Sequence, residues 1–271
     1  PSLVKRGGPE YGIQVKTVGG DPITASGNPD HPLSLGGIDP LAAASAQLLY
    51  SPARIQGPMK KDAQGRFTSI SWEHGLKELT TALSRHRRSA DSAALISGDE
   101  TGSANEVLSA LLAELNSEAC FLMPSDSCTQ ARMWNSTMQG PGALGFDLEE
   151  SDFILAIGAD LLESWGTAVR NQGLLKSRHP ELAFAGSYQT NTSALAGTWV
   201  PIKPEAHGHF ALSLAACVIR RGYGDNLQVR GFSQLKAFLL RHYSPDQVPG
   251  KTGLKFETVD TLARKLLRAR S

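Results

Sequence analysis

The sequence has 271 residues, of which 41% are hydrophobic, enough to bury a large core in two subdomains. Its 27 basic residues nearly balance its 26 acidic residues, so no net field draws the chain to nucleic acid or to an anionic membrane. No apolar run approaches the roughly 20 residues of a membrane helix, so we expect no membrane span and an attachment to membranes only through partners.

Three cysteines are spread over the chain, and they form no CxxC pair and no Cys/His cluster with metal-ligand spacing. Cys217 falls on an apolar helical face and Cys120 in a strand-like run, so we expect both in the core. Cys128 lies near a predicted helix start, where a reactive thiolate is favoured, although a buried structural role is the commoner state of a cysteine.

The chain starts at Pro1 without a methionine and ends at Ser271 inside a helical pattern. We therefore expect it to be a portion of a longer polypeptide.

The first predicted elements belong to an amino-terminal segment over residues 1–66. Alternating apolar residues around Gly19-Gly20-Asp21 predict a β-hairpin over residues 12–26. Asp39 can cap a helix that has Pro40 at its first position and continues over residues 41–49.

From residue 67 onward, short apolar runs alternate with helical patterns. Ser71 is expected to cap a helix, and another helix is predicted over His207–Arg220. Strands are predicted at 67–71, 93–97, 120–123, 153–157, 182–185 and 199–202, of which the strand at 93–97 is expected to be buried, and further helices at 107–115 and 128–138. This alternation predicts an α/β domain over residues 67–271, with a parallel sheet covered by helices on both faces.

One stretch stands out as a candidate site. The apolar run Phe153–Ile157 is typical of a strand buried on both faces, and Gly158 allows a tight turn directly after it. Asp160 can accept hydrogen bonds from the helix that follows, and Trp165 closes the segment. In doubly wound sheets, ligands bind in the loops after the strands' carboxyl ends, but these residues also suit an ordinary strand-to-helix turn.

The residues show little catalytic machinery. The sequence has no G-x-S-x-G elbow, no P-loop and no G-x-G-x-x-G fingerprint. The adjacent carboxylates Glu149 and Glu150 do not face each other on a helix or turn, so they are not a general acid–base pair.

The order of several short motifs resembles the molybdopterin oxidoreductase family, and the resemblance covers nearly the whole chain. The motifs are Gly27-Asn28-Pro29-Asp30-His31-Pro32, Gly37-Ile38, Leu49-Tyr50-Ser51-Pro52-Ala53-Arg54-Ile55, Gly57-Pro58-Met59-Lys60, Ser71-Trp72-Glu73, Gly145-Phe146-Asp147, Gly158-Ala159-Asp160 and Trp199-Val200-Pro201-Ile202-Lys203-Pro204. The resemblance implies the amino-terminal part of a large catalytic-type chain that normally holds an iron–sulfur cluster and a molybdenum centre with two pterin guanine dinucleotides.

The family's functional residues are missing at the positions expected to hold the iron–sulfur cluster. Residues 1–50 contain no cysteine, the last cluster position is Asp39, and the basic residue that links cluster and pterin falls on Leu41. A cluster held by four thiolates cannot form from this segment.

The dinucleotide and metal positions also depart from the family's pattern. The Pro-Arg pair appears as Ser187-Tyr188, the acid before the Trp-Val-Pro strand as Gly197, and the Pro-Gly-Thr-acid turn as Pro204-Glu205-Ala206-His207. Without those polar partners a buried guanine edge stays unpaired. Cys128 lies near the metal-ligand position. We therefore expect no catalytic residue, no bound cofactor and no metal, and a vestigial cleft with Cys128, Gly158, Asp160 and Trp165 as its candidate residues.

The sequence retains the motifs of the family's fold but lacks the residues that bind its cofactors. In this it resembles the non-catalytic branch of the family, known from the quinone reductase complex of sulfate reducers and from alternative complex III. The resemblance implies a location on the periplasmic side of the cytoplasmic membrane. Its expected partners are a multihaem cytochrome c subunit, an iron–sulfur subunit, and an integral membrane quinone-binding subunit, with no nucleic acid.

Two alternatives stay open from the sequence. One is an active molybdenum enzyme of the polysulfide or thiosulfate reductase type, with molybdopterin guanine dinucleotide as cofactor and Cys128 as metal ligand. The other is a free-standing binding protein that uses the loops at Gly98, Gly158 and Ser187.

Overall fold

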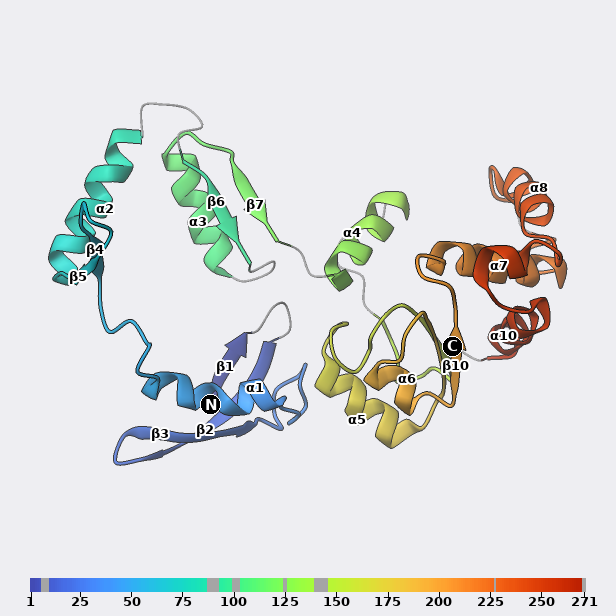
Figure 1. Ribbon diagram of the computed structural model, residues 1–271, viewed down its shortest axis with the longest axis horizontal. Coiled ribbons are helices and arrows are strands. Elements are labelled where there is room, and N and C mark those ends of the chain that lie inside the picture. The colour runs from blue at the N-terminus through green and yellow to red at the C-terminus, as the bar shows by residue number, and fades with distance from the viewer. Residues whose placement is uncertain are drawn as a thin grey trace. The chain divides into compact units, whose positions relative to one another are not determined.

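A computed structural model describes residues 1–5, 10–86, 93–98, 103–123, 126–138, 146–226 and 228–269. Contacts divide the chain into two compact units, Pro1–Leu144 and Gly145–Ser271 (Figure 1). The boundary predicted from the sequence, after residue 66, lies inside the first unit. None of the described helices is long and apolar enough to cross a membrane.

The first unit begins with a three-stranded antiparallel sheet, formed in the order β1 (Ser2–Lys5), β2 (Glu10–Val18) and β3 (Asp21–Gly27). The hairpin predicted over residues 12–26 is confirmed, and its turn contains Gly19 and Gly20 at φ values of 61° and 96°. Such left-handed backbone is cheap only for glycine.

A short helix follows this sheet. The predicted cap is confirmed, because the backbone N–H of Ala42 donates to Asp39 Oδ1 over 2.6 Å at the start of α1 (Pro40–Ala43). The helix then tightens into the 3₁₀ segment η1 (Ala44–Tyr50).

The next elements are a hairpin and a long helix. β4 (Met59–Lys61) and β5 (Phe67–Ser69) pair antiparallel, and α2 (Trp72–His86) follows them. The predicted cap is confirmed here too, since the N–H of His74 donates to Ser71 Oγ over 3.1 Å.

The first unit ends with a parallel pair of strands. β6 (Leu95–Ser97) and β7 (Cys120–Leu122) are joined by α3 (Ser103–Glu114), and α4 (Asp126–Met138) follows them. Figure 1 shows α3 beside this pair.

Two predictions about burial in this region are wrong. The strand at residues 93–97 is not buried, since Ile96 is 72% exposed and its cross-strand neighbour Phe121 is 58% exposed. Cys120 is exposed rather than part of the core. The reason is that, within the described ranges, the sheet at this place has two strands, so each strand is an edge that no further strand covers.

The second unit is built on a three-stranded parallel sheet in the order β10 (Thr198–Pro201), β9 (Glu181–Gly186) and β8 (Phe153–Ile157). One face carries the apolar side chains Ile154, Leu182 and Phe184, which pack with residues of α5 (Ala168–Arg178) and of the turn after β8. The short helix α6 (Asn191–Leu195) lies between β9 and β10.

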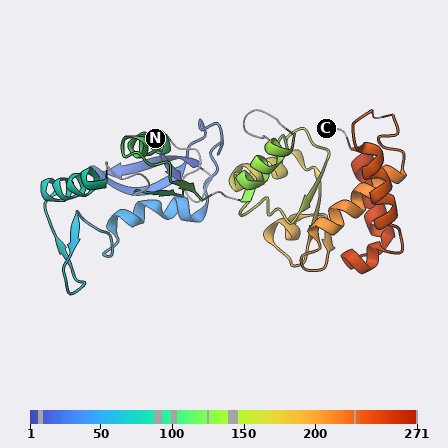
Figure 2. The same ribbon diagram turned by 90° about the horizontal axis from the view of Figure 1, so that it is seen from above.

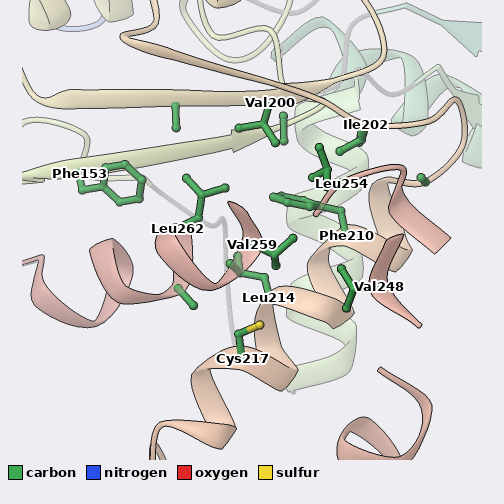
Figure 3. Packing of buried hydrophobic residues seen from close by; sticks show 14 residues of the cluster. Phe153, Val200, Ile202, Phe210, Leu214, Cys217, Val248, Leu254, Val259 and Leu262 are labelled. Atoms are coloured by element: carbon green, nitrogen blue, oxygen red, sulfur yellow. The ribbon is translucent and has the colours of Figure 1, made fainter. Parts of the chain in front are cut away.

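The opposite face of the sheet forms the larger core. Here Phe153 and Val200 meet Phe210 of α7 (His207–Arg220) and Val259 of α10 (Phe256–Arg268), as Figure 3 shows. Two further helices, α8 (Phe232–His242) and α9 (Val248–Thr252), pack against α7, and the orange-to-red helices lie together in both views (Figures 1 and 2). The predicted fold class, a parallel sheet covered by helices, is therefore confirmed.

Cys217 of α7 lies in this core, as predicted. Burial raises the pKa of its thiol to about 11, and the nearby Asp260 carboxylate adds to the rise. This cysteine is therefore a neutral, packed side chain at physiological pH.

Candidate functional site at the carboxyl edge of the parallel sheet

The three parallel strands of the second unit end at one edge, so the loops that follow them lie at that edge. These loops are residues 158–167 after β8, 187–190 after β9 and 202–206 after β10. The predicted cleft residues Gly158, Asp160 and Trp165 all belong to the first of these loops.

Gly158 makes the tight turn that the sequence predicts. Its φ is 65°, and its N–H donates to the carbonyl of Ala185 at the end of β9 over 2.9 Å. A Cβ placed on Gly158 would lie 2.8 Å from Cδ2 and 3.0 Å from Nε2 of His207. The imidazole of the first residue of α7 therefore lies directly against the backbone of this glycine.

Asp160 has a different role from the predicted helix cap. Its carbonyl accepts from the N–H groups of Ser164 and Trp165, over 3.1 and 2.9 Å, so a turn follows rather than a helix. Its carboxylate accepts a hydrogen bond from the hydroxyl of Thr192. The helix α5 begins only at Ala168, because the left-handed backbone of Gly166 is not compatible with an earlier helix start.

Thr192 is the partner that sequence reasoning missed. Its hydroxyl is fully buried and also accepts from the N–H of Leu162 over 3.1 Å, so it joins α6 to the loop after β8. The signal was the capping pattern of α6, where the side chains of Thr190 and Ser193 cap each other's backbone, because it fixes Thr192 on the first turn of the helix.

Trp165 packs edge-on against Phe146, with ring centroids 4.6 Å apart. The carbonyl of Trp165 accepts from the side-chain amide of Asn171, which also donates to the carbonyl of Leu161 over 2.8 Å. Asn171 is buried and was also missed, since nothing in the sequence separates a bridging asparagine on α5 from a solvated one.

Cys128 lies in the first turn of α4, in the first unit, and its side chain is outside the described part of the chain. The structure therefore groups Gly158, Asp160 and Trp165 but does not test Cys128. Among the described residues, no group of three His, Cys, Asp or Glu side chains could hold a metal ion.

The charges of the three loops do not suit a diphosphate. Acidic side chains are present at Asp160, Glu163 and Glu205, whereas the one lysine, Lys203, donates to the carbonyl of Gly250 over 2.9 Å. Diphosphate sites need positive charge or free N–H donors that point at the ligand. The acidic side chains of these loops and the His207 ring against Gly158 both act against a pterin guanine dinucleotide at this edge.

Comparison with known proteins identifies the family of this chain. The model of the molybdopterin oxidoreductase family matches residues 54–241. The menaquinone reductase molybdopterin-binding-like subunit of Nitratidesulfovibrio vulgaris is 39% identical over 266 residues, which are 96% of this chain and 38% of that protein.

More distant similarities agree. The probable oxidoreductase YyaE of Bacillus subtilis is 24% identical over 93% of this chain and 39% of its own length. The structure of acetylene hydratase from Pelobacter acetylenicus superposes with a TM-score of 0.73 at 18% identity, over 94% of this chain and 36% of that one. The chain thus spans well under half the length of these relatives. With the family match covering most of its length, the chain belongs to the molybdopterin oxidoreductase family.

Proposed function

We propose that this chain is a non-catalytic scaffold of the molybdopterin oxidoreductase type in a membrane-associated respiratory quinone reductase complex. In this role it organises electron transfer between cytochrome and iron–sulfur partners and the quinone pool. It binds no molybdopterin cofactor and no metal, and it carries out no substrate chemistry itself.

The observation that carries the proposal is the 39% identity, over nearly the whole chain, with a menaquinone reductase component whose name describes it as molybdopterin-binding-like. The acidic carboxyl edge and the His207 ring against Gly158 support a cofactor-free scaffold, because both oppose a bound dinucleotide.

The amino-terminal segment supports the same proposal. At the position expected for the last cluster ligand, Asp39 uses its carboxylate to cap α1. At the position expected for the linking basic residue, Leu41 has no charge to offer and is largely exposed. Asp39 therefore has a structural role and Leu41 faces solvent, and neither has the role in cluster binding or electron transfer expected at its position.

The proposal includes the surroundings of the chain. Its partners are a multihaem cytochrome c subunit, an iron–sulfur subunit, and an integral membrane quinone-binding subunit, which hold it on the periplasmic side of the membrane. A scaffold of this kind needs surfaces for its neighbours, and the exposed apolar side chains of the first unit, such as Ile96 and Phe121, are available for such contacts.

The test is a Cys128→Ala substitution in the intact complex, with Cys120→Ala on the exposed strand β7 as matched control. Because no metal is held, both variants should keep quinone-linked electron transfer within about twofold of the wild type. A collapse of activity together with loss of molybdenum in Cys128→Ala alone would favour the active molybdenum enzyme of the polysulfide or thiosulfate reductase type instead.

A further inference from the structure

A pocket of about 490 Å³ opens on the second unit, on the α5 side of the sheet. Its apolar lining comes from Pro180 and from four leucines on different elements: Leu162 in the loop after β8, Leu175 on α5, Leu182 on β9 and Leu195 on α6. A volume of this size and a mainly apolar lining are typical of small-molecule sites.

Helix α5 and the loop after β8 form neighbouring parts of the pocket wall. The side chains of α5 that line it follow the spacing of one helix face, at positions 172, 175 and 176. The amide of Gln172 donates to the carbonyl of Leu162 over 3.1 Å and so ties α5 to the loop beside the pocket. Leu162 and Leu182 are buried at its floor, whereas Leu195 at its rim is 72% exposed.

Two basic side chains complete the lining, Lys176 on the last turn of α5 and His179 at its carboxyl-terminal cap. Neither forms an ion pair or a side-chain hydrogen bond within the described part of the chain, and no acidic residue lines the pocket there. The neighbouring Arg178, in contrast, pairs with Glu150 over 3.3 Å.

The backbone of His179 is itself unusual. Its φ is 51°, in the left-handed region where a helix normally ends with glycine, and its N–H donates to the carbonyl of Leu175 over 3.2 Å. A side chain costs stability in this conformation, and such costs gather at functional positions. The fold thus holds an imidazole beside an apolar pocket, at a position where glycine would cost less conformational free energy.

We propose that this pocket binds a hydrocarbon carboxylate, with its chain against the four leucines and its carboxylate beside Lys176 and His179. Apolar surface removed from water supplies the affinity, and the two basic groups select an anionic head over a neutral one. This site lies in the second unit and does not depend on the proposed role of the chain as a respiratory scaffold.

The test is calorimetric titration of the full chain with decanoate below its micelle concentration, and with decanol as the neutral analogue of the same chain length. Lys176→Glu is compared with Lys255→Glu, an exposed lysine on α10's amino-terminal cap. Leu195→Asp is compared with Val229→Asp, an exposed apolar residue elsewhere in the unit. Circular dichroism and thermal unfolding verify that every variant is folded.

We expect saturable binding of decanoate at one site, and binding of decanol that is weaker by about tenfold. Lys176→Glu should weaken decanoate by about tenfold and leave decanol unchanged, whereas Leu195→Asp should weaken both, and the two controls neither. Absence of saturable decanoate binding, equal affinity for decanol, or equal losses in the control variants would overturn the proposal.

Discussion

At the scale of single residues, the close approach of His207 to Gly158 makes the strongest prediction. A Gly158→Ala variant places a methyl group against the imidazole and also strains the left-handed backbone. We expect a loss of about 2–4 kcal/mol in the free energy of unfolding, measured by urea titration. Gly231→Ala is the matched control, because its φ is 84° but a Cβ there meets nothing within 4 Å, so only the backbone cost of about 1–2 kcal/mol remains.

The same pair allows a rescue. In a His207→Ala background the clash is gone, so Gly158→Ala should cost no more than Gly231→Ala. If Gly158→Ala and Gly231→Ala were equally costly in the wild-type background, the imidazole would not occupy the space over Gly158.

The two described cysteines should differ in reactivity. Because burial raises the pKa of the Cys217 thiol to about 11, raising the pH from 7 to 10 leaves it mainly protonated as well as inaccessible. In a Cys128→Ala background, iodoacetamide should therefore label Cys120 alone in the folded chain, and both thiols in denaturant. Labelling of Cys217 at pH 10 at the rate of Cys120 would contradict the packed core.

At the scale of elements, the hydroxyl of Thr192 connects α6 with the loop after β8. Thr192→Val keeps the shape but leaves the N–H of Leu162 and the carboxylate of Asp160 without this partner. We expect a loss of about 1–3 kcal/mol in urea unfolding. Thr261→Val is the control, since that hydroxyl is exposed on α10 and should cost less than about 0.5 kcal/mol; an equal loss in both variants would argue against the connection.

The sequence predicts those elements whose signals are local. The bounds of β8 and α7 agree with the prediction residue by residue, because an unbroken apolar run and a helical periodicity decide them. The caps at Asp39 and Ser71 are likewise short-range hydrogen bonds. The start of α5 could not be predicted, because Asp160 pairs with a threonine 32 positions away instead of capping a helix.

Burial is harder to predict than element type, as β6 and β7 demonstrate. Their apolar composition predicts a core strand, but burial depends on how many strands pair and on which faces helices cover. Of the candidate site, Gly158, Asp160 and Trp165 were found from one loop, whereas His207 was noted only as a departure from the family's acid, and its packing on Gly158 needed the structure.

At the scale of the whole molecule, the chain combines a family scaffold with a carboxyl edge whose loops carry mainly acidic charged side chains. The parallel sheet, its two helical faces and the family match are all present. Of the charged side chains in the loops at this edge, Asp160, Glu163 and Glu205 are acidic, and Lys203 donates to a backbone carbonyl. The proposed function follows from this combination: a scaffold of the family without the chemistry that the family usually places on it.

The most direct test of this central claim is metal and pterin analysis of the purified native complex. Molybdenum and tungsten are measured by elemental analysis, and pterin by the fluorescence of its oxidised form. We predict that none of the three is present at a stoichiometric level. One equivalent of metal with two of pterin per complex, lost on removal of this chain, would contradict the claim and make Cys128 the first residue to mutate.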